Sequence, residues 1–506
     1  MDYPSFGLEL IGKAFSFETF QWLVLSWVVY RIALALYNVS PLAAMTFAYE
    51  AWYDFVPHVG RYGFEIKKMH EKYGPIVRIN PEELHTIDQG LADAIYAGGG
   101  EGRFRDKHQH YLNTMVEPLL QSTFATRDHE THRIRRSAIS RFFSRQQILK
   151  LEPEVHELAQ HLCDKMEQSA GPIELSEAFN CFTADTISQY AFGQPLGFLA
   201  QEGWKPNFRA ATLASLSMCY VYKFIPVLRA WAYVAPYLVP YLQGSIRLLM
   251  EEMTVKIPTY VRRAMDERAD GRIFSELLGS KLPDEEKTVY RLSGEGFSLM
   301  SAGTETTATA LSMITYNLLS QPRILARLRG ELDSLVATDP KALKWNTLER
   351  SPYLYGVIYE ALRLTYGVST RNPRIARDED LVYQKGSYNY VIPKGTPIGM
   401  SSVMQHHDEA VFPESYKYKP ERWLDAAGER NHELEKYLFT FSKGTRQCLG
   451  MNLALCELSL VTAALALRVL PRAELYETTD EDVAFDHELV LPQIKKGLRG
   501  VQIIVK

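Results

Sequence analysis

The sequence predicts a mainly α-helical domain with small β-sheets, preceded by a single N-terminal transmembrane helix. Three features support this: an apolar run near the N-terminus, three later segments with strong helical patterns, and an alternating stretch at residues 371–400 punctuated by Gly and Pro. The chain has 506 residues, 46% of them hydrophobic, enough to bury a large core. No linker or repeat divides it, so we expect an anchor at residues 1–44 and one domain at residues 45–506.

The apolar run near the N-terminus is FQWLVLSWVVYRIALALYNV, interrupted by Arg31. A helix over residues 20–36 would span roughly 25 Å, slightly less than the hydrocarbon core of a bilayer. A cleavable signal peptide is the alternative, but the residues before the run are more acidic than basic and no small-residue cleavage site follows. We favour an uncleaved anchor, and the first basic residues after it favour a cytoplasmic position for the domain.

Net charge and cysteine content argue against two classes of protein. The chain carries 56 basic and 60 acidic residues, so there is no overall positive field to attract nucleic acid. Its five cysteines are too few and too irregularly spaced for a disulfide framework or a Cys-x-x-Cys zinc site. We therefore expect the domain to face a reducing compartment. The cysteines are Cys163, Cys181, Cys219, Cys448 and Cys456.

The first strongly helical segment is DHETHRIRRSAISRFFS, residues 128–144. Asp128 stands in the N-cap position, and apolar residues follow four apart. Its arginines lie over more than one face of the predicted helix, so a solvated basic helix is an alternative to a binding role. They are Arg133, Arg135, Arg136 and Arg141.

The second helical segment runs from residue 294 to residue 320 and ends before Pro322. It is apolar on most faces, as expected for a helix through the centre of a domain. Its middle reads SAGTETT, where Gly303 alone costs about 1 kcal/mol relative to alanine. Such a cluster either lets another helix approach closely or leaves room for a ligand, and a buried Glu305 requires a partner or a function.

The third helical segment, PYLYGVIYEALRLTYG, places Glu360 and Arg363 three residues apart on one face. A buried pair of this kind needs further hydrogen bonds to offset its desolvation, so we expect another arginine nearby. Arg422, in the segment YKYKPERWL, is the candidate.

The segment FSKGTRQCLG contains one cysteine, Cys448, just before a long apolar helix. The helix N-terminus, together with Lys443 and Arg446, is expected to stabilise a thiolate there. A thiolate acts as a nucleophile, a redox thiol or a metal ligand. No base lies nearby in the sequence, and Cys456 lies about two helical turns away, out of disulfide reach.

This segment resembles the haem-ligand loop of the cytochrome P-450 family, Phe-x-x-Gly-x-Arg-x-Cys-x-Gly. All five fixed positions match: Phe441, Gly444, Arg446, Cys448 and Gly450.

Three further motifs occur in the family's order, and the resemblance covers residues 45–506. SAGTETT resembles the central oxygen-activating helix, and Glu360-x-x-Arg363 with PERW at 420–423 resembles the Glu-Arg-Arg structural triad. His132-x-x-x-Arg136 resembles the propionate-binding helix, although the family usually has Trp where this chain has His132.

The resemblance implies the cytochrome P-450 fold and a haem b whose iron is bound by the Cys448 thiolate. Glu305 and Thr306 resemble the acid and alcohol pair that relays protons during oxygen activation. Gly444 and Gly450 are expected to let the backbone approach the porphyrin. Arg374 is expected to bind a propionate, and Arg371 or Arg377 are the alternatives for that role. The residues assigned to the haem are His132, Arg136, Ala302, Arg374, Phe441, Arg446, Cys448 and Gly450.

The function implied by this resemblance is that of a haem-thiolate monooxygenase in the endoplasmic reticulum membrane, with its domain facing the cytoplasm. It would take electrons from NADPH-cytochrome P-450 reductase and use dioxygen to hydroxylate or epoxidise a hydrophobic small molecule. Segments such as MHEKYGPIVRINPEELH look most like fungal trichodiene-oxygenase-type enzymes, which indicates terpenoid, meroterpenoid, polyketide or alkaloid biosynthesis. A haem-thiolate isomerase or lyase acting on a peroxide, and a non-catalytic haem sensor, are the alternatives.

Two surfaces complete the expectations. Residues 224–242 are apolar but contain three prolines, so they either dip into the membrane near a substrate entrance or pack into the core. Basic residues form a candidate docking face for an acidic reductase, or a merely solvated face. They are Arg133, Arg135, Arg141 and Lys443.

Overall fold

The computed structural model places the domain that follows the predicted anchor. The anchor helix at residues 20–36, and most of the segment 1–44, lie outside the described residues. The structure describes residues 40–98, 102–230, 237, 239–267, 271–339 and 343–506.

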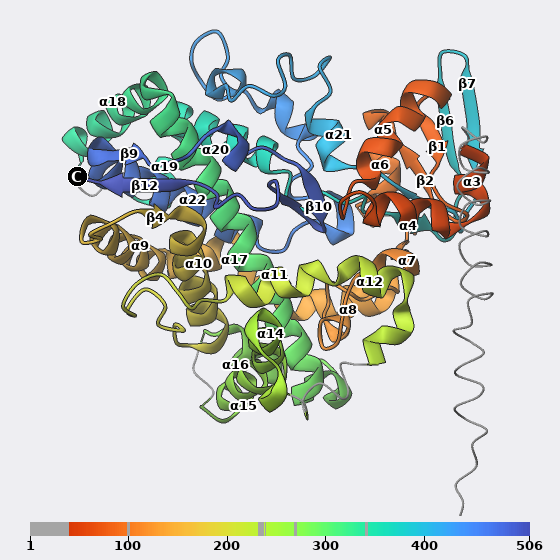
Figure 1. Cartoon of the computed structure of the whole chain (residues 1–506), viewed down its shortest axis with the longest axis horizontal. Helices are drawn as coiled ribbons and strands as arrows, with labels where there is room; N and C mark the ends of the chain where they lie inside the picture. Colours follow the sequence, from red (N-terminus) through yellow and green to blue (C-terminus); the bar gives the residue numbers. More distant parts are fainter. Residues whose placement is uncertain (1–39, 99–101, 231–236, 238, 268–270, 340–342) are drawn as a thin grey trace, which may run out of the picture.

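Helices dominate the described chain, as the sequence predicts (Figure 1). In chain order the α-helices are α3 (Ser40–Met45), α4 (Phe47–Phe55), α5 (Tyr62–Tyr73), α6 (Ala92–Ile95), α7 (Gln109–Leu112), α8 (His129–Ser140), α9 (Arg145–Glu167), α10 (Leu175–Phe192), α11 (Arg209–Ser217), α12 (Cys219–Phe224), α14 (Gly244–Glu251), α15 (Ile257–Glu267), α16 (Ile273–Leu278), α17 (Val289–Ser320), α18 (Pro322–Thr338), α19 (Trp345–Leu348), α20 (Pro352–Thr365), α21 (Ser402–His406) and α22 (Met451–Ala464).

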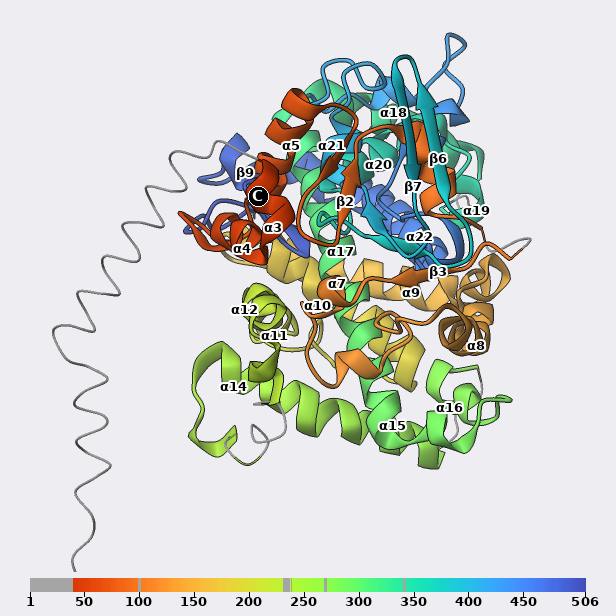
Figure 2. The same cartoon turned by 90° about the vertical axis from the view of Figure 1, so that its right-hand side faces the viewer.

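The strands are short and form small sheets, and those of residues 371–400 confirm the predicted strand-and-turn region. One sheet has the order β1-β2-β8-β5-β3, with only β2 and β8 parallel, and another has the order β4-β12-β9. The hairpins β6–β7 and β10–β11 stand apart, and β6–β7 lies at the edge of the molecule (Figure 1 and Figure 2). The strands are β1 (Ile76–Arg78), β2 (Leu84–Thr86), β3 (Arg105–Lys107), β4 (Ile173–Glu174), β5 (Arg374–Ala376), β6 (Leu381–Lys385), β7 (Tyr388–Ile392), β8 (Pro397–Gly399), β9 (Ala473–Leu475), β10 (His487–Leu489), β11 (Leu491–Gln493) and β12 (Gln502–Val505).

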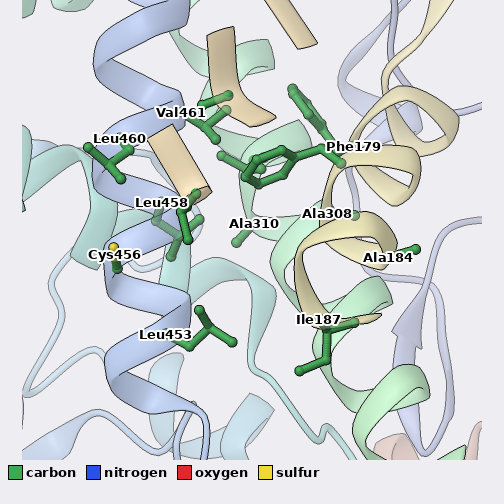
Figure 3. Packing of buried hydrophobic residues seen from close by; sticks show 14 of the residues in the cluster. Phe179, Ala184, Ile187, Ala308, Ala310, Leu453, Cys456, Leu458, Leu460 and Val461 are labelled. Atoms are coloured by element: carbon green, nitrogen blue, oxygen red, sulfur yellow. The ribbon is translucent and has the colours of Figure 1, made fainter. Parts of the chain in front are cut away.

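Helix α17 runs through the middle of the domain and packs between α10 and α22 (Figure 3). It begins at Val289, earlier than predicted, because Thr288 caps it by accepting a hydrogen bond from the Arg291 N–H. Gly294 continues this helix: a Cβ there would lie 2.3 Å from the Pro118 carbonyl oxygen, so only glycine permits the approach.

Helix α22 is the principal apolar helix of the core. Among the described residues, Met451–Arg472 is the one helical stretch long and apolar enough to cross a membrane, with a mean hydropathy of 2.0. However, 78% of that window is buried inside the protein. This burial is typical of a core helix.

Residues 224–242 contain no continuous helix in their described part, which has two short 3₁₀ turns, Pro226–Ala230 and Val239–Tyr241. Val227 and Tyr241 are exposed at 74% and 82%, whereas Val239 and Leu242 pack against the core. The segment therefore combines a core-packed part with an apolar, solvent-facing part.

The predicted arginine partner of Glu360 is confirmed. Glu360 and Arg363 are fully buried and pair at 2.8 Å, and Arg422 approaches the same carboxylate at 3.2 Å. The Trp423 indole N–H also donates to Glu360, at 3.0 Å. These contacts join α20 to the 3₁₀ turn Pro420–Trp423.

Candidate functional site

A cavity of about 260 Å³ lies between α17 and the loop that precedes α22. Glu305 and Arg374 do not line it. A larger groove of about 1080 Å³, between α5, α21 and the C-terminal end of α17, contains none of the predicted site residues, so we assign the chemistry to the smaller cavity. The predicted residues that line this cavity are His132, Arg136, Ala302, Thr306, Phe441, Arg446, Cys448 and Gly450.

The loop around Cys448 is a tight turn fixed by its own backbone. The Cys448 N–H donates to the Phe441 carbonyl at 2.8 Å, and the turn continues into α22, with Gly450 at the N-cap. Gly444 has φ +71°, and a Cβ there would lie 2.1 Å from the Tyr96 carbonyl oxygen. Gly444 therefore serves the contact with the 96–97 backbone, which differs from the predicted role of admitting a porphyrin.

Gly450 fits the predicted role. A Cβ built on it would meet no atom within 4 Å, and the residue lines the cavity. The backbone beside Cys448 is thus open to a large planar group.

The Cys448 side chain is exposed on the cavity wall, but protein surrounds that wall. Burial raises the pKa of the Cys448 thiol, while the Gly450 N–H and the charge of Arg136 lower it. The expectation that Lys443 and Arg446 make the free thiol a thiolate is therefore wrong. Lys443 donates to the Lys436 carbonyl and lies 3.8 Å from Asp93, away from the sulfur.

Arg446 is held by main-chain oxygens. Its guanidinium donates to carbonyls of residues 126, 127 and 128 at 2.6–3.2 Å, which joins the thiol loop to the start of α8. Asp128 caps α8 as predicted, accepting from the Thr131 N–H at 2.8 Å. This geometry brings Arg446 beside His132 and Arg136 of α8.

These residues belong to a buried group of basic side chains that lack a close ion pair with a carboxylate. None of them takes part in an ion pair within the part of the chain that the structure describes. The pKa of each is lowered, first by burial and then, for all but Arg136 and Arg374, by its basic neighbours; for Arg446, Asp106 and Asp128 oppose part of this effect. The pKa of His132 falls to about 2 and that of Arg446 to about 9. The members of this cation group are Lys107, His132, Arg136, Arg374 and Arg446.

An uncompensated group of buried cations is unfavourable unless an anion joins it. The haem implied by the sequence carries two propionate carboxylates, which supply that charge. The cavity thus offers a thiol, an open glycine and a set of cations, and these residues fit a haem.

Lys107 was missed by sequence reasoning, because a lone lysine in β3 belongs to no motif. It is 2% exposed, lines the cavity and donates to the Phe124 carbonyl. Only its position opposite Arg446 and Arg374 shows that it belongs to the site.

Arg371 and Arg377, the alternatives to Arg374 as propionate ligands, both have carboxylate partners. Arg371 is buried in ion pairs with Glu50 and Glu83, and Arg377 lies near the surface beside Asp128. Arg374 is 2% exposed and lies behind the cavity wall, close enough to His132 to lower its pKa.

Helix α17 forms the cavity wall opposite the thiol loop. Thr306 lines the cavity, and its Oγ1 donates to the Ala302 carbonyl at 2.7 Å, so its lone pairs are free to accept from a group in the cavity. Gly303 also lines the cavity, and a Cβ there would lie 3.1 Å from Ile187 of α10. Both predicted roles of the SAGTETT cluster, close helix packing and space for a ligand, thus apply.

Glu305 faces the opposite side of α17. Its carboxylate accepts from the Asn180 amide at 2.9 Å and lies 3.5 Å from the Arg209 guanidinium. It is therefore an ion-paired residue between α10, α11 and α17, one position away from the cavity-lining Thr306.

Three arginines on α8 and in the turn that follows it are paired with carboxylates. Arg135 pairs with Glu286 at 2.7 Å, Arg141 with Glu276 at 3.0 Å, and Arg133 with Glu130 at 2.9 Å. An acidic partner at this face would have to compete with these pairs.

Comparison with known proteins agrees with the geometry. The cytochrome P-450 family model matches residues 55–490. The cytochrome P-450 monooxygenase ppzE of Metarhizium majus is 40% identical over 83% of this chain and 92% of its own.

Two further relatives carry reaction names. The N-acetyltryptophan 6-hydroxylase ivoC of Emericella nidulans is 36% identical over 97% of this chain and 98% of its own. The tryptophan 6-hydroxylase fscE of Fusarium equiseti is 36% identical over 94% of this chain and 93% of its own.

Proposed function

The chain belongs to the cytochrome P-450 family of haem-thiolate monooxygenases, and from this premise we propose that it hydroxylates or epoxidises a hydrophobic small molecule of a secondary-metabolite pathway. The observation that carries the proposal is the cavity lined by Cys448, by Thr306 and by every member of the cation group except Arg374. Relatives named as monooxygenases and hydroxylases support this reaction over a peroxide isomerase, a lyase or a haem sensor.

Cys448 is the residue placed to bind the haem iron, and the cation group is placed to neutralise the propionates. Bound haem supplies the activation of dioxygen, with the thiolate ligand favouring cleavage of the O–O bond. The charge of Arg136 and the Gly450 N–H both favour the anionic sulfur. Phe441 lines the cavity beside the sulfur and limits access of water to it.

Thr306 is placed to hold a proton-bearing group in the cavity. Because its own proton is directed to Ala302, the hydroxyl accepts a hydrogen bond first and donates only when that helix bond opens. Glu305 stabilises this part of α17 through Asn180 and Arg209, and a change in that ion pair would be needed for it to exchange protons with the cavity.

The substrate class follows from the remaining lining of the cavity. Apolar side chains predominate there, which favours a hydrophobic substrate and excludes water from the reacting atoms. The relatives named as an N-acetyltryptophan 6-hydroxylase and a tryptophan 6-hydroxylase support hydroxylation of an aromatic compound. The apolar residues include Phe124, Ile139, Leu299, Val368 and Leu491.

Membrane attachment and the electron donor belong to the same proposal. A position at the endoplasmic reticulum membrane, facing the cytoplasm, agrees with the apolar run at residues 20–36. Exposed apolar side chains at Phe55, Val227 and Tyr241 provide a second region of membrane contact. NADPH-cytochrome P-450 reductase is the proposed donor.

The test uses the full-length enzyme with haem, a fungal NADPH-cytochrome P-450 reductase, NADPH and heavy-isotope dioxygen. We expect indole and terpenoid substrates to include at least one that gains a single labelled oxygen atom in a reductase-dependent reaction. The Cys448→Ser variant is the control and is expected to form no product. Substrate conversion without reductase and without label would contradict the proposal.

A further inference from the structure

A small polar cavity of about 20 Å³ lies beside the haem cavity. Four buried side-chain oxygens on its wall make no close hydrogen bond in the protein: Glu83 Oε1, Tyr111 Oη, Tyr220 Oη and Thr370 Oγ1. Glu83 Oε1 lies 3.5 Å from the Arg371 guanidinium, and the Tyr111 and Thr370 side chains are near enough to interact. A buried water needs roughly 10–15 Å³ and two to four polar partners. The small cavity therefore has the size and the chemistry to hold one water molecule.

The small cavity is connected to the haem cavity by Thr370. This residue lies after α20, is 7% exposed and lines both cavities. Among the described residues, Thr370 is the one that lines both the small cavity and the haem cavity.

On its other side the small cavity is connected to the surface through two carboxylates and a histidine. Glu83 Oε2 lies 3.8 Å from His108 Nδ1, and His108 Nε2 lies 2.8 Å from Glu82 Oε2. The Glu82 side chain is 57% exposed, whereas those of His108 and Glu83 are buried. A histidine between two carboxylates can take a proton at one ring nitrogen and release one from the other.

The charge states of His108 and Glu83 decide which step of this path is uphill. Burial lowers the pKa of His108, but Glu83 and Glu82 outweigh it, so the pKa rises overall. Burial raises the pKa of Glu83, but Arg371 and His108 outweigh it, so the pKa falls overall. These shifts stabilise a proton on His108 and a negative charge on Glu83, so the transfer of that proton to Glu83 is the uphill step of the path.

We propose that Glu82, His108, Glu83 and a water in the small cavity conduct protons from solvent to Thr370, which passes them into the haem cavity. This path is separate from Thr306 and Glu305 on α17. The proposal rests on the proposed function, because a monooxygenase releases one oxygen atom as water and so consumes protons in that cavity.

Each transfer balances without electrons or a further reactant. The protonated His108 passes its Nδ1 proton to Glu83 and is left neutral, with its remaining proton on Nε2. The water takes the proton from Glu83 and gives another to Thr370 Oγ1, which releases its own hydroxyl proton into the haem cavity. A flip of the His108 ring then turns its N–H toward Glu83 and its bare nitrogen toward Glu82, which takes a proton from solvent and passes it on. His108 is again protonated, and the net change is one proton moved inward.

The decisive variant is Thr370→Val, which keeps the side-chain shape and removes the hydroxyl. The matched control is Thr114→Val: Thr114 lines the same small cavity, but its Oγ1 already donates to the Tyr111 carbonyl at 2.8 Å. In the haem-loaded enzyme with reductase, we expect Thr370→Val to lower the ratio of product formed to NADPH consumed about three- to tenfold, because the Thr306 route remains. Thr114→Val should keep the wild-type ratio.

Two further readouts separate proton transfer from packing. Glu83→Gln should lower the same ratio and enlarge the solvent isotope effect, while the substrate dissociation constant from optical titration stays unchanged. A high-resolution crystal structure should show a water bonded to Thr370 and Glu83 in the wild type, and its loss in Thr370→Val.

The outcomes are distinct. No water in the wild-type structure, or unchanged ratios in Thr370→Val and Glu83→Gln, would refute the path while an active wild type upholds the proposed function. An equal drop in Thr114→Val would refute it in favour of local packing. No product from the wild type itself would instead count against the proposed function.

Discussion

Replacing Glu360 with glutamine tests whether the buried triad supports the haem site. Five hydrogen bonds of 2.8–3.2 Å converge on this carboxylate: two from Arg363 and one each from the Lys419 N–H, Arg422 and the Trp423 indole. Glutamine keeps the volume but removes the charge and turns one acceptor into a donor. Two arginines then lack their buried counter-charge.

The expected loss of stability in Glu360→Gln follows from the burial of this carboxylate and its arginines. Removing one partner of a buried ion pair costs about 3–5 kcal/mol, a large share of the roughly 5–15 kcal/mol that stabilises a folded protein. The effect should extend to the thiol loop. Arg363 also donates to the His406 carbonyl at 2.9 Å, and His406 Nε2 accepts from the Phe439 N–H at 2.7 Å, close before Cys448.

The assay combines urea denaturation followed by circular dichroism with the haem-to-protein ratio of the purified enzyme. Glu360→Gln is expected to lower the free energy of unfolding by about 3–5 kcal/mol and to lose most of its haem. The control is Glu130→Gln, which breaks the pair with Arg133 at the same spacing on exposed α8 and should cost at most about 1 kcal/mol. If both variants changed stability equally, or if Glu360→Gln kept full haem, the reasoning would be wrong.

Further predictions concern the thiol, the threonine, the cation group and the anchor. Cys448→Ser should abolish the absorption band of the reduced, carbon-monoxide-bound enzyme, and Cys456→Ser, outside the cavity, should keep it; retention in both would mean that another ligand binds the iron. Thr306→Ala should still bind haem and oxidise NADPH but release hydrogen peroxide, with product per NADPH at least about tenfold lower; an unchanged ratio would exclude the relay role. Lys107→Met should speed haem transfer to apomyoglobin about tenfold or more, because a bond to a charged group is worth roughly 1.5–3 kcal/mol; an unchanged rate would remove Lys107 from the cation group. Deleting residues 1–40 should move much of the protein to the soluble fraction with its haem, and full retention on membranes would assign attachment to the exposed apolar residues of the domain.

The sequence predicted the features that depend on neighbours along the chain. The Asp128 cap, the helical periodicities and the spacing around Cys448 are local patterns, and each predicted the right type of element, although α17 begins earlier than predicted and α8 ends at Ser140. The pairing of Glu360 with Arg422 was also predictable, because a buried carboxylate needs more partners than one helix supplies.

The direction in which a side chain points, and the total charge of the side chains around it, were decided only by the tertiary structure. Periodicity along α17 did not show that Glu305 turns toward Asn180 and Arg209 while Thr306 lines the cavity. Lys107, on β3, joins Arg446 and His132 from distant parts of the chain, and the lowered pKa of each arises from burial and from basic neighbours that only folding brings together. The local sequence pattern determines whether a residue lies in a helix or a strand. The electrostatic field at its side chain is instead a sum over side chains that are remote in sequence. The Cys448 thiol, which the sequence predicted to be a thiolate, is therefore one whose pKa is raised by burial.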